Sequence, residues 1–243
     1  MYKFKIIIMK KFTKFLRAVA CIACLLTVSN VSAQITWPPL GSGMLGDGTE
    51  NDPYQITTYS ELYYLAYYVN EGNGPLTEGV YYKLMSDITS PNRNWPQIGD
   101  NATSDATFRG NFDGNGKVVY LHIPGGSYVG LFGYVSYATI HNLGIEECSN
   151  KGDQYVGGLI GYADNSTIDN CYVVGSVTGN SSVGGLIGIS NNSTVSNCYA
   201  ICEVSGDSNI GGLVGVNNGT IQRSYSGGNV TEKGTGRQMF RNL

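Results

Sequence analysis

A two-part motif recurs four times in the second half of the chain, and this repetition constrains the fold more than any other feature. The first part is Gly-Leu-apolar-Gly, and its copies begin at intervals of 28, 27 and 27 residues, at Gly130, Gly158, Gly185 and Gly212. The second part is a Thr-Ile or Thr-Val pair that follows each copy, at Thr139, Thr167, Thr194 and Thr220. A fixed period in the twenties indicates a solenoid, in which each repeat buries its core against its neighbours.

The repeated segments have the character of β-strands rather than helices. Each copy contains short runs rich in β-branched and aromatic residues, such as YVGGLIGY and TIDNCYVVGSV, separated by Asn, Ser, Asp and Gly. The repeats show no helical period of 3.6, and the chain is rich in glycine, at 34 of 243 residues. The sequence therefore predicts an all-β fold, a parallel β-helix of about 27-residue coils and roughly five coils in length. Right-handed is the usual form of such helices.

Stacked coils place equivalent residues above one another, about 4.8 Å apart. Two apolar ladders follow from the repeat, one of leucines and one of β-branched residues. Their members are Leu131, Leu159, Leu186 and Leu213, and Val129, Val156, Val183 and Ile210. Asn142, Asn170 and Asn197 share a further repeat position, where each amide is expected to hydrogen-bond to the amide above it.

Cysteine replaces leucine at one ladder position. Cys171 and Cys198 stand where the first repeat has Leu143, so their simplest interpretation is as small buried hydrophobes. A disulfide between them is the alternative, although facing residues on in-register parallel strands rarely have the required geometry. Beyond residue 33 the chain has neither a Cys-x-x-Cys motif nor a Cys/His cluster, so we expect no metal ion and no cofactor.

These motifs resemble those of a known family. Gly-Leu-apolar-Gly followed by Thr-Ile-x-Asn-Cys-Tyr is similar to the GLUG-motif repeats of bacterial surface proteins, and the similarity covers about residues 108–230. GLUG repeats also accompany some adhesins and the non-catalytic regions of immunoglobulin A-specific metallopeptidases. The resemblance implies a β-helical module that is secreted or displayed on the cell surface, and it does not indicate a ligand.

The first 33 residues differ in composition from the rest of the chain. Six of the 15 Lys and Arg residues open the segment, an apolar run covers residues 18–31, and Val31-Ser32-Ala33 offers a small-residue cleavage site. This pattern predicts a signal peptide (1–33) and an exported protein, with a lipid-modified Cys21 or Cys24 as the alternative. The apolar run is too short to span a bilayer comfortably. The remaining nine basic residues face 18 Asp and Glu, which argues against nucleic acid as a partner.

The residues before the repeats are expected to cap the β-helix. Thr58 and Glu61 form a capping box, and the apolar spacing behind them predicts an amphipathic helix near 58–71 that plugs the open end. The expected divisions are a cap with linker and first strands (34–107), a β-helix with GLUG-type repeats (108–231), and an unstructured or truncated tail (232–243). Since the tail lacks the motif, we expect a fragment of a longer repeat protein whose uncapped last coil self-associates end to end.

Parallel β-helices also host polysaccharide lyases and hydrolases, which need acids paired with other charged residues on neighbouring coils. Acids of the repeats such as Asp164 and Asp169 fall at different repeat positions and form no column, and Arg109 with Asp113 is the only close acid–base pair. The run DGNG at 113–116 is interpreted as a tight turn rather than a calcium loop. We therefore assign no catalytic residue, and a carbohydrate-active β-helix enzyme is the alternative.

One column of aromatic residues is the candidate ligand-binding surface. Tyr172, Tyr199 and Tyr225 share a repeat position, and they point outward if the neighbouring cysteines point inward. Such rings would either stack on sugar rings or stack on one another, contributing roughly 0.2–1 kcal/mol per strand pair. The predicted function is a non-enzymatic adhesion module that binds a glycan or a host protein. A structural stalk of a longer surface protein is the alternative.

Overall fold

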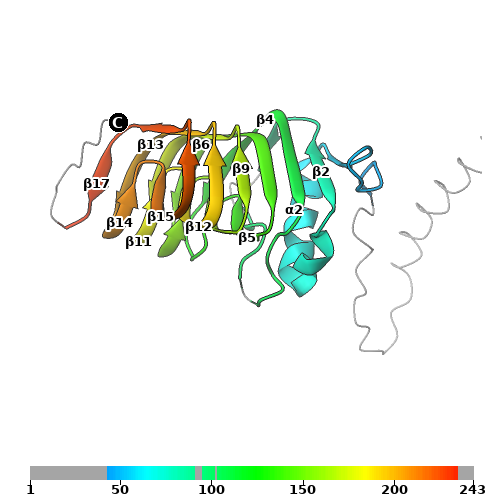
Figure 1. Cartoon of the computed structure of the whole chain (residues 1–243), viewed down its shortest axis with the longest axis horizontal. Coiled ribbons are helices and arrows are strands. Elements are labelled where there is room, and N and C mark those ends of the chain that lie inside the picture. Colours follow the sequence, from blue (N-terminus) through cyan, green and yellow to red (C-terminus); the bar gives the residue numbers. More distant parts are fainter. Residues whose placement is uncertain (1–42, 91–94, 102, 235–243) are drawn as a thin grey trace, which may run out of the picture. The chain divides into compact units, whose positions relative to one another are not determined.

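The computed structural model describes residues 43–90, 95–101 and 103–234, and these residues form the predicted parallel β-helix (Figure 1). Strands of successive repeats pair in parallel and in register, so that residues 27 positions apart, such as Tyr172 and Tyr199, lie opposite each other. The fold class predicted from the repeat is confirmed. The predicted signal peptide (1–33) and the end of the predicted tail (235–243) lie outside the described residues.

Each coil has four segments, which stack on their counterparts to form four faces. Face 1 consists of β5 (Phe132–Ser136), β8 (Ile160–Asp164) and the beginnings of β12 (Ile187–Ser196) and β15 (Val214–Gln222). Face 2 consists of β1 (Tyr54–Ile56), β2 (Tyr81–Leu84), β9 (Thr167–Asp169), the beginnings of β4 (Asn111–Ile123) and β6 (Thr139–Lys151), and the ends of β12 and β15.

Faces 3 and 4 complete each coil and return the chain to face 1. Face 3 consists of β3 (Ile88–Thr89), the ends of β4 and β6, β10 (Tyr172–Thr178), β13 (Tyr199–Gly206), β16 (Tyr225–Gly227) and β17 (Val230–Glu232). Face 4 is the shortest and consists of β7 (Gln154–Val156), β11 (Ser181–Gly184) and β14 (Ser208–Gly211).

Residues in the left-handed backbone region turn the chain between faces. At the corner between faces 2 and 3, φ is +56° at Asn142, +50° at Asn170 and +54° at Asn197. Asparagine tolerates this region better than most residues because its short amide side chain can hydrogen-bond locally. The recurrent asparagine of the motif is therefore first of all a corner residue.

The amide ladder predicted for these asparagines forms only in part. Asn170 Nδ2 donates to Asn142 Oδ1 at 2.8 Å, as expected. Asn142 and Asn197 instead donate to the carboxylates of Asp113 and Asp169, at 3.1 Å and 2.6 Å. A carboxylate is a stronger acceptor than an amide oxygen, so an acid one coil earlier captures the asparagine amide where one is within reach.

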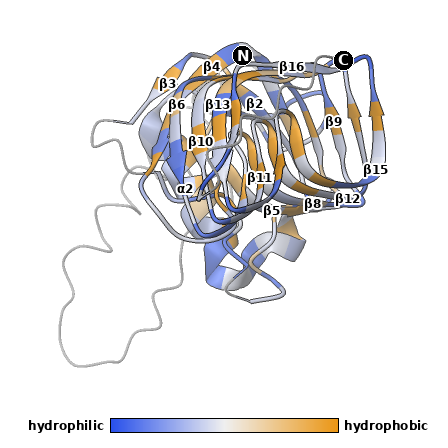
Figure 2. Cartoon of the chain, turned by 90° about the vertical axis from the view of Figure 1, so that its left-hand side faces the viewer, coloured by the Kyte–Doolittle hydropathy of each residue, from blue (hydrophilic) through white to orange (hydrophobic). Residues whose placement is uncertain are grey.

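Apolar ladders fill the interior, and hydrophobic residues recur along the strands of successive coils (Figure 2). The predicted ladder residues of the first three repeats are buried: Leu131, Leu159, Leu186, Val129, Val156 and Val183. Phe108, Phe112 and Phe132 fill the core of the early coils, with ring centroids 5.2–6.5 Å apart. The later coils bury smaller side chains, and Leu213 and Ile210 of the last described coil are only partly buried.

The glycines of the motif are required by contacts between coils. A Cβ atom on Gly185 would lie 2.2 Å from the carbonyl oxygen of Gly212. A Cβ atom on Gly188 would lie 2.7 Å from the backbone of Tyr155 and Val156 in the preceding coil. Only glycine allows the backbone to approach this closely. The Gly-Leu-apolar-Gly signature therefore reflects the close packing of coils rather than a binding site.

A helical insertion replaces part of the first coil between β1 and β2. It consists of α2 (Tyr59–Tyr68), a π-helical segment (Val69–Asn73) and a 3₁₀ segment (Gly74–Thr77). The expected capping box is present, because Thr58 Oγ1 accepts from the Glu61 N–H and Glu61 Oε2 accepts from the Thr58 N–H. Leu62 and Leu65 of α2 are buried in the same core as the coils. Among the described residues, no helix has the length and apolar character needed to cross a membrane.

Candidate functional site

The predicted aromatic column lies on face 3, and we call Tyr172, Tyr199 and Tyr225 the tyrosine row. Strands β10, β13 and β16 hold the three residues directly opposite one another. The chain turns at Asn170, Cys171 enters the core, and strand alternation then directs Tyr172 outward. The structure therefore brings the three predicted residues together on one surface.

The rings of the tyrosine row are stacked on one another. Ring centroids are 5.0 Å apart for Tyr172 and Tyr199 and 5.3 Å apart for Tyr199 and Tyr225, with planes within 5° and 8° of parallel. Parallel rings at this distance must overlap, because two rings side by side in one plane would collide. The ring faces within the row are therefore largely covered by neighbouring rings, and Tyr225 is the most open member, with 58% of its surface exposed.

The first ring of the row is fixed by two contacts with the preceding coil. Tyr172 Oη donates to Glu146 Oε1 at 2.8 Å. Burial raises the pKa of Tyr172 above its ordinary value, and the bond to Glu146 raises it further. Gly144 lies opposite Tyr172, and a Cβ atom there would lie 2.5 Å from the tyrosine ring. The missing side chain at Gly144 is what allows the row to lean against the preceding coil.

Two aliphatic residues extend the tyrosine row into an apolar strip. Val174 and Ile201 lie two residues beyond Tyr172 and Tyr199, pair with each other and have 38% and 41% of their surfaces exposed. We call the row together with Val174 and Ile201 the apolar strip. Contiguous exposed apolar residues on a charged protein are typical of a surface that contacts a partner.

A second group of tyrosines lies away from the row, and it consists of Tyr128, Tyr134, Tyr155 and Tyr162, which we call the tyrosine cluster. Tyr134 and Tyr162 pair across β5 and β8 on face 1, whereas Tyr155 lies in β7 on face 4. Centroid distances within the cluster run from 4.8 to 6.4 Å. Apart from the near-parallel pair Tyr128–Tyr134, the ring planes meet at 46° to 87°. All four residues are half-buried.

The backbone at two cluster residues adopts a conformation that suits tyrosine poorly. Tyr128 and Tyr155 have φ of +56° and +57°. The equivalent positions of the next coils hold Ser182 and Asn209, and asparagine is among the residues that tolerate this region. The left-handed region costs most residues roughly 1–2 kcal/mol relative to the right-handed one. The first coils therefore carry tyrosine where the local backbone favours a smaller polar residue.

Two charged side chains flank the tyrosine cluster. Burial raises the pKa of Tyr134, the nearby Asp164 carboxylate raises it further, and the Arg109 guanidinium opposes both effects. Asp164 is held in place, because its two carboxylate oxygens accept from Asn191 Nδ2 at 2.7 Å and from Asn165 Nδ2 at 2.8 Å. The cluster thus combines four aromatic rings with a fixed anion and a nearby cation.

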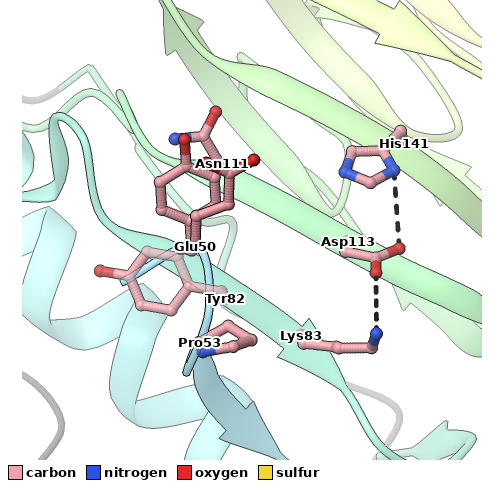
Figure 3. A pocket seen from close by; sticks show the side chains of 8 residues that line it. Glu50, Pro53, Tyr82, Lys83, Asn111, Asp113 and His141 are labelled. Atoms are coloured by element: carbon pink, nitrogen blue, oxygen red, sulfur yellow. Dashed lines mark ion pairs between the residues drawn. The ribbon is translucent and has the colours of Figure 1, made fainter. Parts of the chain in front are cut away.

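Face 2 carries a column of charged residues beside a pocket of about 190 Å³ (Figure 3). Strand register places Lys83, Asp113, His141 and Asp169 one above the other. Lys83 Nζ lies 3.4 Å from Asp113 Oδ2, and His141 Nδ1 lies 3.6 Å from Asp113 Oδ1. Glu50 and other residues of the lead-in line the other side of the pocket.

One expectation about the acids is wrong, and one column of charged residues is not among the expectations. Arg109 does not pair with Asp113, because its Nε donates to Thr107 Oγ1 at 3.4 Å and Asp113 is taken by Lys83 and His141. Asp113 and Asp169 share a column, with His141 between them. Asp169 lies two residues after the motif threonine, and Asp113 lies two residues after Asn111, which pairs in register with the threonine of the first motif copy.

Hydrogen bonds keep both acids of this column ionised. Burial alone would raise the pKa of Asp113, but bonds from the Asn142 amide and the Asn115 N–H hold it below its ordinary value. The Ser196 hydroxyl lowers the pKa of Asp169, burial opposes this, and the Asn197 amide lowers the pKa further. Asp113 also closes the corner at 113–116, where its Oδ1 accepts from the Asn115 N–H at 2.8 Å. Within the described residues, no group of three or more His, Cys, Asp and Glu could hold a metal ion.

The four cysteines outside the predicted signal peptide are free and buried: Cys148, Cys171, Cys198 and Cys202. The Cys171 N–H donates to Cys198 Sγ at 3.4 Å. Burial raises the pKa of Cys171, and it raises that of Cys202 to about 12. The hydrogen bond with the Cys171 thiol instead lowers the pKa of Cys198. All four cysteine side chains are buried and pack as small core residues.

Comparison with known proteins identifies the repeated motif. The model of the GLUG motif matches residues 152–178, which cover β7 through β10. This match confirms the resemblance drawn from the Gly-Leu and Thr-Ile-x-Asn-Cys-Tyr signatures. The matched segment contains Gly158, Leu159 and Asn170, whose structural roles are close packing, core formation and corner formation.

Two relatives are similar to part of the chain. Halomucin from Haloquadratum walsbyi is 32% identical over 149 residues, which are 56% of this chain and 2% of halomucin. A protein of Evansella cellulosilytica named as a Gly-rich membrane protein is 33% identical over 94 residues, which are 37% of this chain and 10% of that protein. The chain therefore spans only a small part of the length of these two relatives.

A solved structure has a similar fold. It is the crystal structure of a Bacteroides ovatus protein that carries the name of an immunoglobulin A1 protease. The two structures superpose with a TM-score of 0.54 and 20% sequence identity, over 77% of this chain and 69% of the other. At this identity the likeness concerns the β-helical fold alone.

Proposed function

We propose that this chain, which carries the GLUG motif, is a non-enzymatic module of an exported surface protein and binds an extracellular protein through its apolar strip. The observation that carries the proposal is the strip on face 3, where Tyr225, Val174 and Ile201 are exposed beside two half-buried tyrosines on an acidic molecule. The names of halomucin and of the Gly-rich membrane protein, together with the predicted signal peptide, support a place at the cell surface.

The geometry of the rings favours a protein partner over a glycan at this surface. Sugar rings stack on open aromatic faces, and the faces within the tyrosine row are largely covered by neighbouring rings. A flat strip of tyrosines with Val174 and Ile201 instead matches the aromatic and aliphatic composition of protein–protein contact surfaces. Tyrosine residues often carry a large share of the binding free energy at such surfaces.

The charged residues support a non-enzymatic role. Asp113 is engaged by Lys83, His141 and the amide of Asn142, so the groups that could act as acid or base serve the stacking of coils. Asp169 is engaged in the same way by Ser196 and Asn197. These acids already have the partners that lower their pKa, whereas a general acid requires a raised one.

A matched pair of substitutions tests the proposed function. Ile201→Glu places a charge in the apolar strip without removing a ring, and Thr167→Glu places the same charge at an exposed site on face 2. Binding to immobilised fibronectin, collagen, fibrinogen and immunoglobulin A1 is measured by surface plasmon resonance. We expect at least one of these proteins to bind, Ile201→Glu to weaken that binding about tenfold or more, and Thr167→Glu to leave it unchanged.

The stacked rings also favour a second function, that of a stalk displaying other parts of a longer surface protein. In that case the tyrosine row stabilises the coils and no partner contacts it. The proposal is wrong if none of the four proteins binds, or if Ile201→Glu binds as well as the unmodified chain. Either result, obtained with protein that unfolds at its normal temperature, would favour the stalk.

A further inference from the structure

We propose that the tyrosine cluster is a second binding site and that it takes a neutral glycan. The site is separate from the apolar strip, because it lies on faces 1 and 4 while the strip lies on face 3. It also stands independently of the protein partner proposed above. The proposal rests on the orientation of the rings, the polar groups beside them and the backbone conformation of two cluster residues.

The orientation of the rings distinguishes the cluster from the tyrosine row. Tyr155 and Tyr162 meet at 87° and Tyr134 and Tyr162 at 61°, so that in these pairs the edge of one ring meets the face of another. Tyr155 and Tyr162 therefore have no near-parallel neighbour among the four rings, whereas Tyr128 and Tyr134 are stacked at 12°. The C–H groups of a pyranose ring pack against aromatic ring faces, and the four tyrosines are half-buried and thus accessible.

Polar groups beside the rings can bind sugar hydroxyls. Asp164 accepts one amide bond on each carboxylate oxygen, and a carboxylate has about four acceptor sites, so sites remain for a ligand. Arg109 has a planar guanidinium with five N–H donors, of which Nε donates to Thr107 Oγ1 and Nη2 donates to the Ser104 carbonyl oxygen, so donors remain for a ligand. Because the anion and the cation offset each other, the site favours an uncharged ligand with many hydroxyls over a charged one.

The backbone supports the choice of these residues for binding. Tyr128 and Tyr155 hold a left-handed conformation, where later coils place Ser182 and Asn209. A residue kept in a conformation that suits it poorly points to a function other than stability. Gly161 makes this corner possible, because a Cβ atom there would lie 2.6 Å from the backbone of Tyr128. The corner thus presents the Tyr128 and Tyr155 rings beside the pair on face 1.

The test uses cellohexaose, mannohexaose and chitohexaose as probes, titrated into the protein by isothermal titration calorimetry. We expect at least one hexaose to bind, and Tyr162→Ala to weaken that binding about tenfold or more. Tyr162→Phe keeps the ring and should retain most of the affinity. Tyr199→Ala removes a ring of the same kind from the tyrosine row, and it should leave hexaose binding unchanged.

Three results would overturn the proposal. They are the absence of heat with all three hexaoses, unchanged affinity in Tyr162→Ala, and equal losses in Tyr162→Ala and Tyr199→Ala. Sedimentation of the free protein is measured in parallel. Dimerisation that Tyr162→Ala abolishes, without hexaose binding, would assign the cluster to contacts between copies of the chain instead. The absence of hexaose binding at the tyrosine cluster would not affect the Ile201→Glu experiment, so each of the two proposals can be wrong without the other.

Discussion

The tyrosine row and the tyrosine cluster use the same side chain in different ways. In the row, one repeat position supplies every ring, and strand register stacks the rings within 8° of parallel. In the cluster, two repeat positions supply the rings, and most pairs meet at 46° or more. Strict repetition therefore produces a continuous parallel stack, whereas tyrosines confined to two coils produce a cluster in which Tyr155 and Tyr162 have no near-parallel neighbour.

The largest expected effect concerns the corner beneath the cluster. Gly161→Ala places a Cβ atom 2.6 Å from the backbone of Tyr128 and 2.7 Å from the carbonyl oxygen of Gly133, and neither can move aside as a side chain would. We expect the free energy of unfolding to fall by about 3 kcal/mol. Urea unfolding measures it. Gly125→Ala is the control, because a Cβ atom there has open space; an equal loss in both variants would contradict the account.

A smaller effect is expected from removing the central ring of the tyrosine row. Tyr199→Ala removes the central ring and both of its stacked contacts. The free energy of unfolding should fall by about 1–2 kcal/mol, since each aromatic pair contributes roughly 0.5–1.5 kcal/mol. Tyr225→Ala removes only one contact at the end of the row and should cost about half as much. Equal losses would show that the stack does not act as a series of pairs.

A further prediction concerns Tyr172 of the tyrosine row and the melting temperature of the protein at alkaline pH. The folded pKa of Tyr172 is raised, first by burial and then by Glu146, so the unfolded chain releases this proton at lower pH than the folded one. The contribution of the protonated Tyr172 hydroxyl to the free energy of unfolding is present below about pH 10, and it is lost as the pH rises above that value. Tyr172→Phe should flatten this decline in melting temperature between pH 9 and 11, and Glu146→Gln should flatten it partly. An identical decline in the unmodified protein, Tyr172→Phe and Glu146→Gln would contradict the assignment of this pH dependence to Tyr172.

The smallest expected effect concerns the tyrosines whose backbone is left-handed. Tyr155→Asn relieves a left-handed backbone at a cost of some ring contacts, and the later coils show that a small polar residue fits there. The free energy of unfolding should change by no more than about 1 kcal/mol, and hexaose binding should weaken. If Tyr155→Asn lowers the free energy of unfolding as much as Tyr199→Ala does, the main role of Tyr155 is to stabilise the fold.

The sequence predicts those features that repeat in every coil. The fold, the leucine and valine ladders and the register of Tyr172, Tyr199 and Tyr225 all follow from the period of 27. The tyrosine cluster was missed because its residues occupy two repeat positions and are replaced by Ser182 and Ile189 in the next coil. Stacking of residues from different segments depends on how the corners fold, which the period does not specify.

Departures from the repeat also account for the errors in detail. The column of Lys83, Asp113 and His141 does not follow from the repeat pattern, because Tyr81 and Asn111 stand in the early coils where later coils have the motif threonine. The amide ladder is less regular than expected, because Asp113 and Asp169 accept hydrogen bonds from the amides of Asn142 and Asn197. Side-chain partners are chosen by local acceptor strength, and a repeat pattern gives only the position of each residue.

If the β-helix carries two separate binding surfaces, substitutions in each surface should affect different ligands, and one crossed binding experiment decides this. Ile201→Glu and Tyr162→Ala are each measured against the four extracellular proteins and the three hexaoses. The account predicts that Ile201→Glu loses only protein binding and that Tyr162→Ala loses only hexaose binding, each by about tenfold or more. If either variant loses both kinds of binding, or neither variant loses any, the claim of two surfaces is wrong.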